Sequence, residues 1–537
     1  MNISIIIPFV NEKEELFSTI ESIEKNKGRI NHYEIIIIND ASDDMFDYKQ
    51  YMENKKNIRY YENSHRIGVA ACRDMGIALS AHDKFLLLDA HMRIYDEETL
   101  PAFITALTDN KKSIICCRTI GIGDNPRSIT PFAAYIEFFG GHGGLYAEWN
   151  SHDCDPGSSI SRVPCILGAA YAAYKDYWIF LRGLSGLVSY GSDEAYISMK
   201  VWLSGGECLI LKNIVIGHLY RKDPPYTIKH IDYVYNKVFI SLLILPNDLC
   251  LKVLSNLRDT FRIQFSYSMN MLYKNLSNFL VLKEYYEKIL TTSFDIFFKF
   301  NQECESKSVL NINIEPTNMD TNKDIYPVIK SNKEKDYGLY NGKMGLIISS
   351  YLQGDLTFAE KEIDDLIEYI ETNNNINITF SDGLLGIAWG LSFLVEEQMI
   401  ESNINELLSD FDDIIFNRFN MNYWGDWSFE KGFLGLVYYS TMRLYQDKDI
   451  INKYPLFFKF LNKIVKEKYT DESSCLNKPD FPIIAFIFIS FCDKRCKIIN
   501  SITSIEALLH ISNLKNEHKD SLLYKAIVNE PTEQWVL

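Results

Sequence analysis

The chain has 537 residues, 47% of them hydrophobic, and a mean hydropathy of -0.11, as in an ordinary globular protein. A chain of this length exceeds what one hydrophobic core usually organises, so two or three domains are expected. Acidic residues outnumber basic ones by 71 to 55, for a formal net charge of -16. Such a surface repels phosphate backbones and anionic lipids, and no local basic patch offsets it, so binding of nucleic acid or of a membrane surface is disfavoured.

The sequence gives no sign of export or of a membrane span. The N-terminus, MNISIIIPF, leads directly into an apolar run without a basic region or a small-residue cleavage site, so no signal peptide is expected. The apolar stretch at residues 238–245 is far shorter than the roughly 20 residues a spanning helix needs. The eleven cysteines are scattered and lack paired metal spacing, which favours a reduced, cytoplasmic setting.

Residues 1–228 alternate between predicted strands and predicted helices. Apolar runs of four or five residues predict the strands, and longer amphipathic segments predict the helices. Buried runs of this kind between helices are typical of a parallel sheet covered on both faces, so a three-layer α/β domain is expected. The predicted strands cover residues 3–7, 35–38, 85–88 and 114–117, and the predicted helices cover residues 12–25 and 70–79.

The rest of the chain has the composition of helices. A helical extension is predicted over residues 229–300, a polar linker of mixed charge over 301–336, and an all-α region over 337–537. This last region has a weak internal repeat, in which a Gly-x-x-Gly segment opens an apolar helix three times, at intervals of 41 and 49 residues. Ordinary helix-packing glycines are the alternative interpretation. The three pairs are Gly342 with Gly345, Gly383 with Gly386, and Gly432 with Gly435.

Two acids follow directly on predicted strands: Asp40 and Asp89. Ligands of α/β sheets bind outside the carboxyl ends of the strands, although a lone aspartate there is more often a helix cap. In Asp89-Ala90-His91, an extended backbone would turn both polar side chains to one side, within reach of one divalent cation. Mixed oxygen and nitrogen ligands suit Mn²⁺ better than Ca²⁺. His218, after a third apolar run, is a further candidate ligand, or else a surface histidine.

Seven sequence stretches, taken together and in order, resemble the catalytic domain of family-2-type glycosyltransferases of the GT-A fold. The resemblance covers about the first 225 residues and is greatest to polypeptide N-acetylgalactosaminyltransferases and their bacterial relatives. The stretches are IIIPFVNE at 5–12, INDASDD at 38–44, NSHRIGVAACRDMG at 63–76, LLLDAHMRI at 86–94, LGAAYAAYKDYW at 167–178, YGSDEAYISMKVWLSGG at 190–206 and IGHLYRKDPPY at 216–226.

The resemblance implies a role for each matching residue. Asp89, His91 and His218 correspond to the ligands of a Mn²⁺ or Mg²⁺ ion, which offsets negative charge on the leaving UDP. Asp40 corresponds to the aspartate that contacts uridine. The other residues implied in binding the nucleotide sugar are Pro8, Glu12, Arg66 and Arg73, together with Gly168 and Ala169, which lie against the donor sugar.

Asp193 and Glu194 occupy the position of an acidic pair in the family, but in an order that departs from its pattern. In inverting relatives the second acid is the general base, which would be Glu194 here. In retaining relatives the first acid positions donor and acceptor, which would be Asp193. Both assignments stay open, as does a plain stabilising role for two acids near a helix start.

The C-terminal region resembles the lanthionine synthetase C-like α/α toroid in its Gly-x-x-Gly helix starts. The Cys and Cys-His zinc motifs of catalytic members are absent, and about 200 residues is short for a full toroid. A partial, non-catalytic helical module that grasps a peptide is therefore expected.

These observations predict a metal-dependent hexosyl- or N-acetylhexosaminyltransferase. Its donor is a UDP-sugar, and the attached helical module points to a Ser, Thr or Cys side chain of a peptide as acceptor. One alternative acceptor is a surface polysaccharide or a lipid-linked glycan. A second alternative, of another class, is a non-catalytic scaffold that binds peptide.

Overall fold

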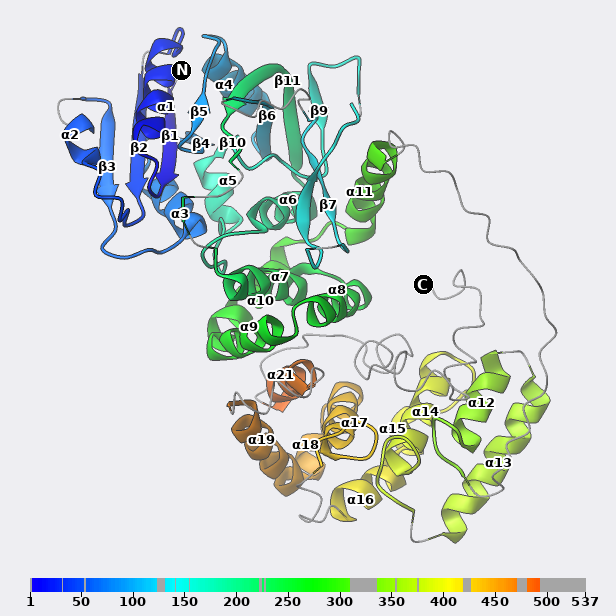
Figure 1. The fold of residues 1–537 in the computed structure, drawn as a ribbon. Helices are drawn as coiled ribbons and strands as arrows, with labels where there is room; N and C mark the ends of the chain where they lie inside the picture. The colour runs from blue at the N-terminus through cyan, green and yellow to red at the C-terminus, as the bar shows by residue number, and fades with distance from the viewer. Residues whose placement is uncertain are drawn as a thin grey trace. The chain divides into compact units, whose positions relative to one another are not determined.

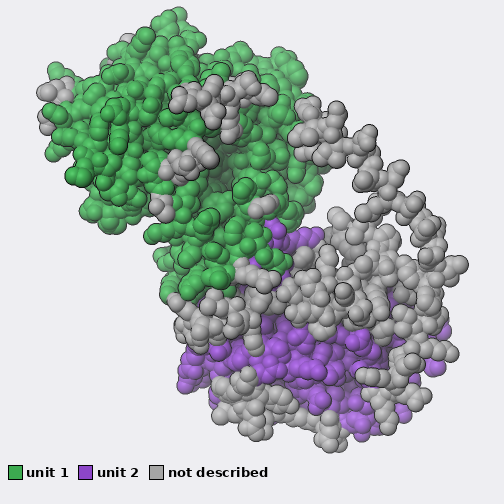
Figure 2. Space-filling model, viewed as in Figure 1, with its two compact units in different colours: residues 1–246, 259–316 green, residues 247–258, 317–537 purple. Residues whose placement is uncertain are grey.

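The computed structural model describes residues 2–30, 32–52, 55–122, 131–140, 142–153, 155–221, 225–226, 228–309, 336–352, 355–373, 376–418, 426–470 and 481–492. The chain forms two compact units (Figure 2). The first consists of Met1–Pro246 and Asp259–Pro316, and the second of Asn247–Arg258 and Thr317–Leu537.

A sheet of nine strands is the centre of the first unit (Figure 1). Its strands lie in the order β3-β2-β1-β4-β10-β6-β11-β5, and β9 pairs with β11 off this path. A separate pair, β7 and β8, forms a two-stranded sheet. The strands are β1 (Asn2–Phe9), β2 (His32–Asn39), β3 (Ile58–Glu62), β4 (Lys84–Leu88), β5 (Met92–Arg93), β6 (Ser113–Gly121), β7 (Ala134–Glu137), β8 (Tyr146–Trp149), β9 (Ile160–Arg162), β10 (Ala170–Tyr174) and β11 (Glu207–His218).

The α/β prediction is confirmed, but the expectation of a parallel sheet was wrong. Strands β3, β2, β1 and β4 are parallel, and so are β6 and β11, whereas β10 runs antiparallel between β4 and β6. The sequence of β10, AYAAY, is rich in alanine and lacks the β-branched run that marks the other strands. Tyr171 and its neighbours are nevertheless fully buried, because strands cover both edges of β10.

Helices cover both faces of the sheet. Alternate isoleucines of β1 and β2 pack with α1 and α4 in one core, and Phe85 of β4 contacts Trp178 of α5 on the other face. Because all the isoleucines of β1 are buried, neither face of the strand meets water. The helices are α1 (Glu14–Lys25), α2 (Tyr48–Met52), α3 (Val69–Leu79), α4 (Thr99–Asp109), α5 (Lys175–Phe180) and α6 (Asp193–Leu203).

The direction of the strands brings distant parts of the chain to one edge of the sheet. Strands β1, β2, β4, β6 and β11 all end at this edge, and the antiparallel β10 begins there, with Ala170 opposite Leu88. The loops that carry Asp40, Asp89, Gly168 and His218 therefore meet at one place.

The helices that follow the sheet are α7 (His230–Ile244), α8 (Asn247–Thr260), α9 (Arg262–Lys274), α10 (Leu276–Ile289) and α11 (Phe294–Val309). The predicted linker, residues 301–336, begins later than expected, because α11 continues to Val309. Asn301 is fully buried, and its amide bonds both the N–H and the carbonyl of Ile136 in β7. These bonds hold α11 against the small sheet. Residues 310–335 lie outside the described residues.

The described residues of the second unit are helical. Apart from α8, its helices are α12 (Lys343–Leu352), α13 (Leu356–Thr372), α14 (Leu384–Glu396), α15 (Ile404–Leu407), α16 (Ser409–Arg418), α17 (Phe433–Gln446), α18 (Ile450–Lys453), α19 (Pro455–Thr470) and α21 (Phe481–Cys492). The predicted Gly-x-x-Gly segments open α12, α14 and α17.

The three segments are equivalent in their contacts. After the first glycine of each, the next N–H donates to a carbonyl seven residues back: Lys343 to Asp336, Leu384 to Asn377 and Phe433 to Asp426, at 2.8–2.9 Å. At each second glycine, a Cβ would overlap the carbonyl oxygen six residues back, so only glycine fits.

The segments are also joined in series by backbone hydrogen bonds. Leu339 and Tyr340 both donate to the carbonyl of Ser381, and Phe380 and Ser381 both donate to the carbonyl of Glu430. The first segment thus bonds to the second, and the second bonds to the third. The internal repeat predicted from the sequence is present as a repeated structure.

Within the described residues, no helix is both long and apolar enough to cross a bilayer. The eight cysteines that the structure describes are free thiols, and seven of them are buried.

Candidate active site

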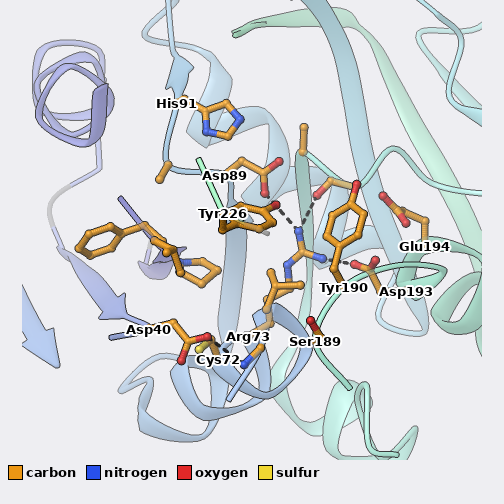
Figure 3. Close-up of a pocket in the computed structure, with 18 of the residues that line it drawn as sticks. Asp40, Cys72, Arg73, Asp89, His91, Ser189, Tyr190, Asp193, Glu194 and Tyr226 are labelled. Carbon is orange, nitrogen blue, oxygen red and sulfur yellow. Dashed lines mark hydrogen bonds and ion pairs between the residues drawn. The ribbon is translucent and has the colours of Figure 1, made fainter. Parts of the chain in front are cut away.

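A cavity of about 690 Å³ lies at the edge where the strand ends meet. All twelve residues singled out from the sequence line it (Figure 3 labels several of them). They are Pro8, Glu12, Asp40, Arg66, Arg73, Asp89, His91, Gly168, Ala169, Asp193, Glu194 and His218.

Asp89, His91 and His218 form a potential metal site, with one ligand atom from each lying within 4.8 Å of the others. Strand pairing brings them together, since His218 ends β11 opposite Met92 of β5, and the N–H of Leu219 donates to the carbonyl of His91 at 3.1 Å. The expected extended geometry of 89–91 was wrong. Ala90 and His91 form a turn between β4 and β5, and this turn directs both side chains to the same point.

The chemistry of this group fits a divalent cation. Both ring nitrogens of His218 are buried and have no hydrogen-bond partner among the described residues, and Nε2 lies 3.7 Å from Oδ2 of Asp89. Burial by itself would raise the pKa of Asp89, but His218, Arg73 and His91 lower it below its usual value. The ionised carboxylate supplies the hard oxygen ligand that Mn²⁺ and Mg²⁺ both prefer, and the two imidazole nitrogens make the mixed set fit Mn²⁺ better than Mg²⁺.

Glu12 contacts His91 and Arg221 through its carboxylate. Its Oε1 lies 3.1 Å from His91 Nδ1, and its two oxygens accept bonds of 2.9 and 2.7 Å from the guanidinium of Arg221. Burial would raise the pKa of Glu12, but the hydrogen bonds from His91 and Arg221 outweigh burial and lower it. The carboxylate is thus ionised and occupied by protein partners.

Arg73 connects the metal group with the acidic pair. Its buried guanidinium donates to Asp89 Oδ1 at 3.1 Å, to the carbonyl of Gly168 at 3.3 Å, and closely to Asp193 Oδ2 (Figure 3). Asp193 is the first residue of α6. The resemblance implies that Arg73 binds the nucleotide sugar, whereas in the structure its charge is shared by the two acids Asp89 and Asp193.

Glu194 faces the start of β10. A Cβ at position 168 would overlap the carboxylate of Glu194, so Gly168 leaves the space that this side chain fills. Burial raises the pKa of Glu194 to about 8, and the neighbouring charge of Asp193 adds to the rise. At neutral pH, Glu194 is therefore mostly a neutral acid.

The other residues expected around the nucleotide line the cavity from several separate parts of the chain. Asp40 accepts backbone N–H bonds from Ile67 and Gly68 at 2.9 and 2.8 Å, which fixes the loop before α3. Arg66 pairs with Asp43 at 2.8 Å. Pro8 belongs to β1, and the carbonyl of Ala169 accepts the N–H of Asp89 at 3.0 Å.

Aromatic residues also line the cavity, and none of them was among the site residues predicted from the sequence. Tyr190 and Tyr226 face each other with ring centroids 6.4 Å apart, and Tyr220 contacts both Trp149 and His218. Tyr190 and Tyr226 match aromatic positions of the family that the sequence resembles, but they were left out of the predicted site because aromatic residues are more often part of a core. Only the folded chain turns them into the cavity.

The geometry can be compared with known proteins. Residues 4–165 match the family described as Glycosyl transferase family 2. Polypeptide N-acetylgalactosaminyltransferase 11 of Xenopus tropicalis is 27% identical over 237 residues, and polypeptide N-acetylgalactosaminyltransferase 10 of Homo sapiens is 28% identical over 243 residues. Both alignments cover 42% of this chain and 39% of the relative, so the chain spans about two fifths of the length of these relatives.

Among solved structures, GalNAc-T7 with UDP, GalNAc and Mn²⁺ aligns with 57% of this chain and 58% of that chain, at a TM-score of 0.47 and 19% identity. From the sequence matches, the first unit carries a glycosyltransferase-type domain. These matches lie in the same unit as the cavity.

Proposed function

We propose that the protein is a metal-dependent glycosyltransferase that moves a hexose or an N-acetylhexosamine from a UDP-sugar to a Ser, Thr or Cys side chain of a peptide. The observation that carries the proposal is the convergence of Asp89, His91 and His218 in the one cavity that also holds an acidic pair. Similarity to glycosyltransferases in the same unit supports it.

Asp89, His91 and His218 would hold Mn²⁺ or Mg²⁺, which when bound supplies positive charge against the developing negative charge of the leaving diphosphate. Asp40 and the loop at 66–68 form the wall on which the nucleoside is expected to lie. Gly168 and Ala169 line the cavity beside the acids, where the resemblance implies that they lie against the donor sugar.

The acidic pair offers two assignments. Glu194, as the carboxylate, could accept the proton of the acceptor side chain. Asp193 is held by Arg73 and lies where it could orient donor and acceptor. We favour Glu194 as the base, because its raised pKa gives it the greater affinity for a proton.

The peptide acceptor is supported by the names of the relatives, which are polypeptide transferases, and by the second unit. That unit's repeated helix starts are the feature that resembles a lanthionine synthetase C-like toroid. We propose that it is a partial, non-catalytic module that holds the peptide.

Mass spectrometry of peptides incubated with the full-length protein, Mn²⁺ and a panel of UDP-sugars tests the proposal. One sugar residue should be added to a Ser, Thr or Cys, and EDTA or His218→Ala should lower product formation by at least about 100-fold. His32→Ala is the matched control, because His32 is exposed at the opposite end of β2 and should leave the rate unchanged.

Three other outcomes would reject parts of the proposal. Full activity in EDTA would exclude the metal role. Transfer to a polysaccharide or lipid-linked glycan, with no peptide product, would replace the acceptor. If no UDP is released with any donor or acceptor, the remaining interpretation is a peptide-binding scaffold.

A further inference from the structure

Glu12 projects into the cavity from a strained turn. The flanking residues Asn11 and Lys13 have φ values of 55° and 49°, a region that residues other than glycine seldom adopt. Such strain persists only where surrounding bonds over-determine it, and it tends to occur at functional sites.

Several hydrogen bonds impose this turn. Asn11 exchanges bonds with Asp43, its amide donating at 2.8 Å and its side-chain oxygen accepting at 2.9 Å, and the N–H of Lys13 donates to the hydroxyl of Tyr48 at 2.8 Å. The loop between β1 and α1 is thus tied to the segment after β2. The result is that the carboxylate of Glu12 lies beneath His91, with only 4% of its side chain exposed.

The carboxylate bonds two segments that both carry metal-site residues. His91 belongs to the turn after β4, and Arg221 follows His218 by three residues. The guanidinium grips both oxygens of Glu12 in a bidentate pair, the arrangement that restricts a carboxylate most strongly. One oxygen of the same carboxylate then faces His91 Nδ1.

We propose that Glu12 is the positioning residue of the metal site, an inference that rests on the proposed function. Glu12 accepts the Nδ1–H of His91, which fixes the tautomer and leaves the Nε2 lone pair for the cation, while Arg221 holds Glu12 in that orientation. Such carboxylate–histidine pairs behind a metal set both the direction and the basicity of the ligand.

This role replaces the one that the resemblance implied for Glu12, which was contact with the nucleotide sugar. Both oxygens are occupied by charged or polar partners from the protein. A buried carboxylate would also repel a pyrophosphate. Glu12 therefore influences donor binding indirectly, by orienting His91 as a ligand of the cation.

Electron paramagnetic resonance of Mn²⁺ titrated into the full-length protein tests the inference. Glu12→Ala should weaken Mn²⁺ binding about 10- to 100-fold. Glu12→Gln should bind Mn²⁺ between wild type and Glu12→Ala, because an amide oxygen can still accept from His91, and it keeps the size of the side chain if the alanine variant fails to fold. Glu21→Gln is the control: Glu21 also accepts a hydrogen bond, from Tyr51, but is exposed on α1.

Two further readouts separate positioning from other roles. At saturating Mn²⁺, UDP affinity and the transfer rate of Glu12→Gln should return to within about twofold of wild type, because ligand alignment, and not donor contact, was lost. Weak UDP binding at saturating Mn²⁺ would assign Glu12 to the nucleotide instead. If wild type binds Mn²⁺ and both Glu12 variants bind it equally well, the inference fails while the proposed function stands. If wild type does not bind Mn²⁺, the proposed function fails.

Discussion

Arg73 is the residue on which the charge balance of the cavity depends. It is only 5% exposed, lies over the ring of Tyr171, and is shared by Asp89 and Asp193, which are 104 positions apart in the sequence. Removing one partner of such a buried group leaves an uncompensated charge. A planar guanidinium can serve both carboxylates and the Gly168 carbonyl at once, which a lysine ammonium, a single point of charge, cannot do in the same geometry.

The raised pKa of Glu194 predicts the pH dependence of sugar transfer. Below about pH 8 the group is mostly protonated and cannot accept a proton, so the rate should increase with pH and level off above that value. Glu194→Gln should lower kcat by about 100-fold or more and remove this pH dependence. Initial rates between about pH 6.5 and 9, at saturating donor and metal, measure both effects.

A matched control for this experiment is Glu303→Gln, since Glu303 is exposed on α11 and outside the cavity. It should keep both the wild-type rate and the pH profile. If the wild-type rate does not change with pH over this range, Glu194 is not the base. In that case Asp193, which accepts a hydrogen bond from Arg73, is the remaining acid of the pair.

At the scale of elements, the sequence predicts most of the scaffold. The buried apolar runs of β1, β2, β4 and β6 are unambiguous, because β-branched and leucine-rich segments between helices have few other uses. The antiparallel β10 could not be predicted, since its alanines carry little strand preference and its burial comes from its neighbours. The start of the linker was also misplaced, because the burial of Asn301 is a tertiary effect.

The candidate site was predictable only in part, because some of its contacts join residues that are far apart in the sequence. Asp89 and Asp40 could be located because they follow strand ends, and His218 because it follows an apolar run. The bond from Glu12 to Arg221 joins residues 209 positions apart, and no periodicity in the sequence reports such a pair. The strained turn at 11–13 is likewise set by Asp43 and Tyr48.

The repeated helix starts predict that alanine substitutions at two glycines of α14 change the free energy of unfolding by different amounts. In Gly386→Ala, the added Cβ would overlap the backbone carbonyl of Phe380 and contact Leu339, so the free energy of unfolding should fall by about 1–3 kcal/mol. In Gly390→Ala, the nearest atoms belong to the flexible side chain of Met344, and the roughly 1 kcal/mol gain in helix propensity offsets the crowding.

Urea unfolding followed by far-ultraviolet circular dichroism measures both variants. Gly386→Ala should shift the helical transition to lower urea, while Gly390→Ala should stay near wild type. Equal stability of Gly386→Ala and wild type would show that the backbone contact at the helix start is not required.

At the scale of the whole molecule, net charge and cavity charge have the same sign. The cavity contains Glu12, Asp40, Asp89, Asp193, Glu194 and Asp232, against Arg66, Arg73 and Lys229. Even with Glu194 protonated, acids exceed bases, and the chain as a whole carries -16. An anionic donor therefore meets repulsion unless a cation is bound.

Calorimetry of UDP binding should show this requirement. With Mn²⁺ removed by EDTA, the affinity for UDP should fall at least about 10-fold, equivalent to about 1.4 kcal/mol. Uridine is the matched control, because it lacks the diphosphate and should bind with the same affinity in both conditions. Undiminished UDP binding in EDTA would contradict the electrostatic argument.

The pairing of β6 with β11 has a consequence for the order in which a growing polypeptide acquires its parts. Ser113 pairs with Glu207, so that edge of the sheet stays incomplete until residues nearly a hundred positions later have left the ribosome. His218 is the last residue of β11. A nascent chain that ends before His218 therefore lacks one of the three side chains of the candidate metal site. Successive Gly-x-x-Gly segments of the second unit are only 41 and 49 positions apart. Contacts between them close shorter loops than the pairing of β6 with β11, so they should form sooner after their residues are synthesised. A cation held by these three groups would therefore bind only after β11 has been added to the sheet.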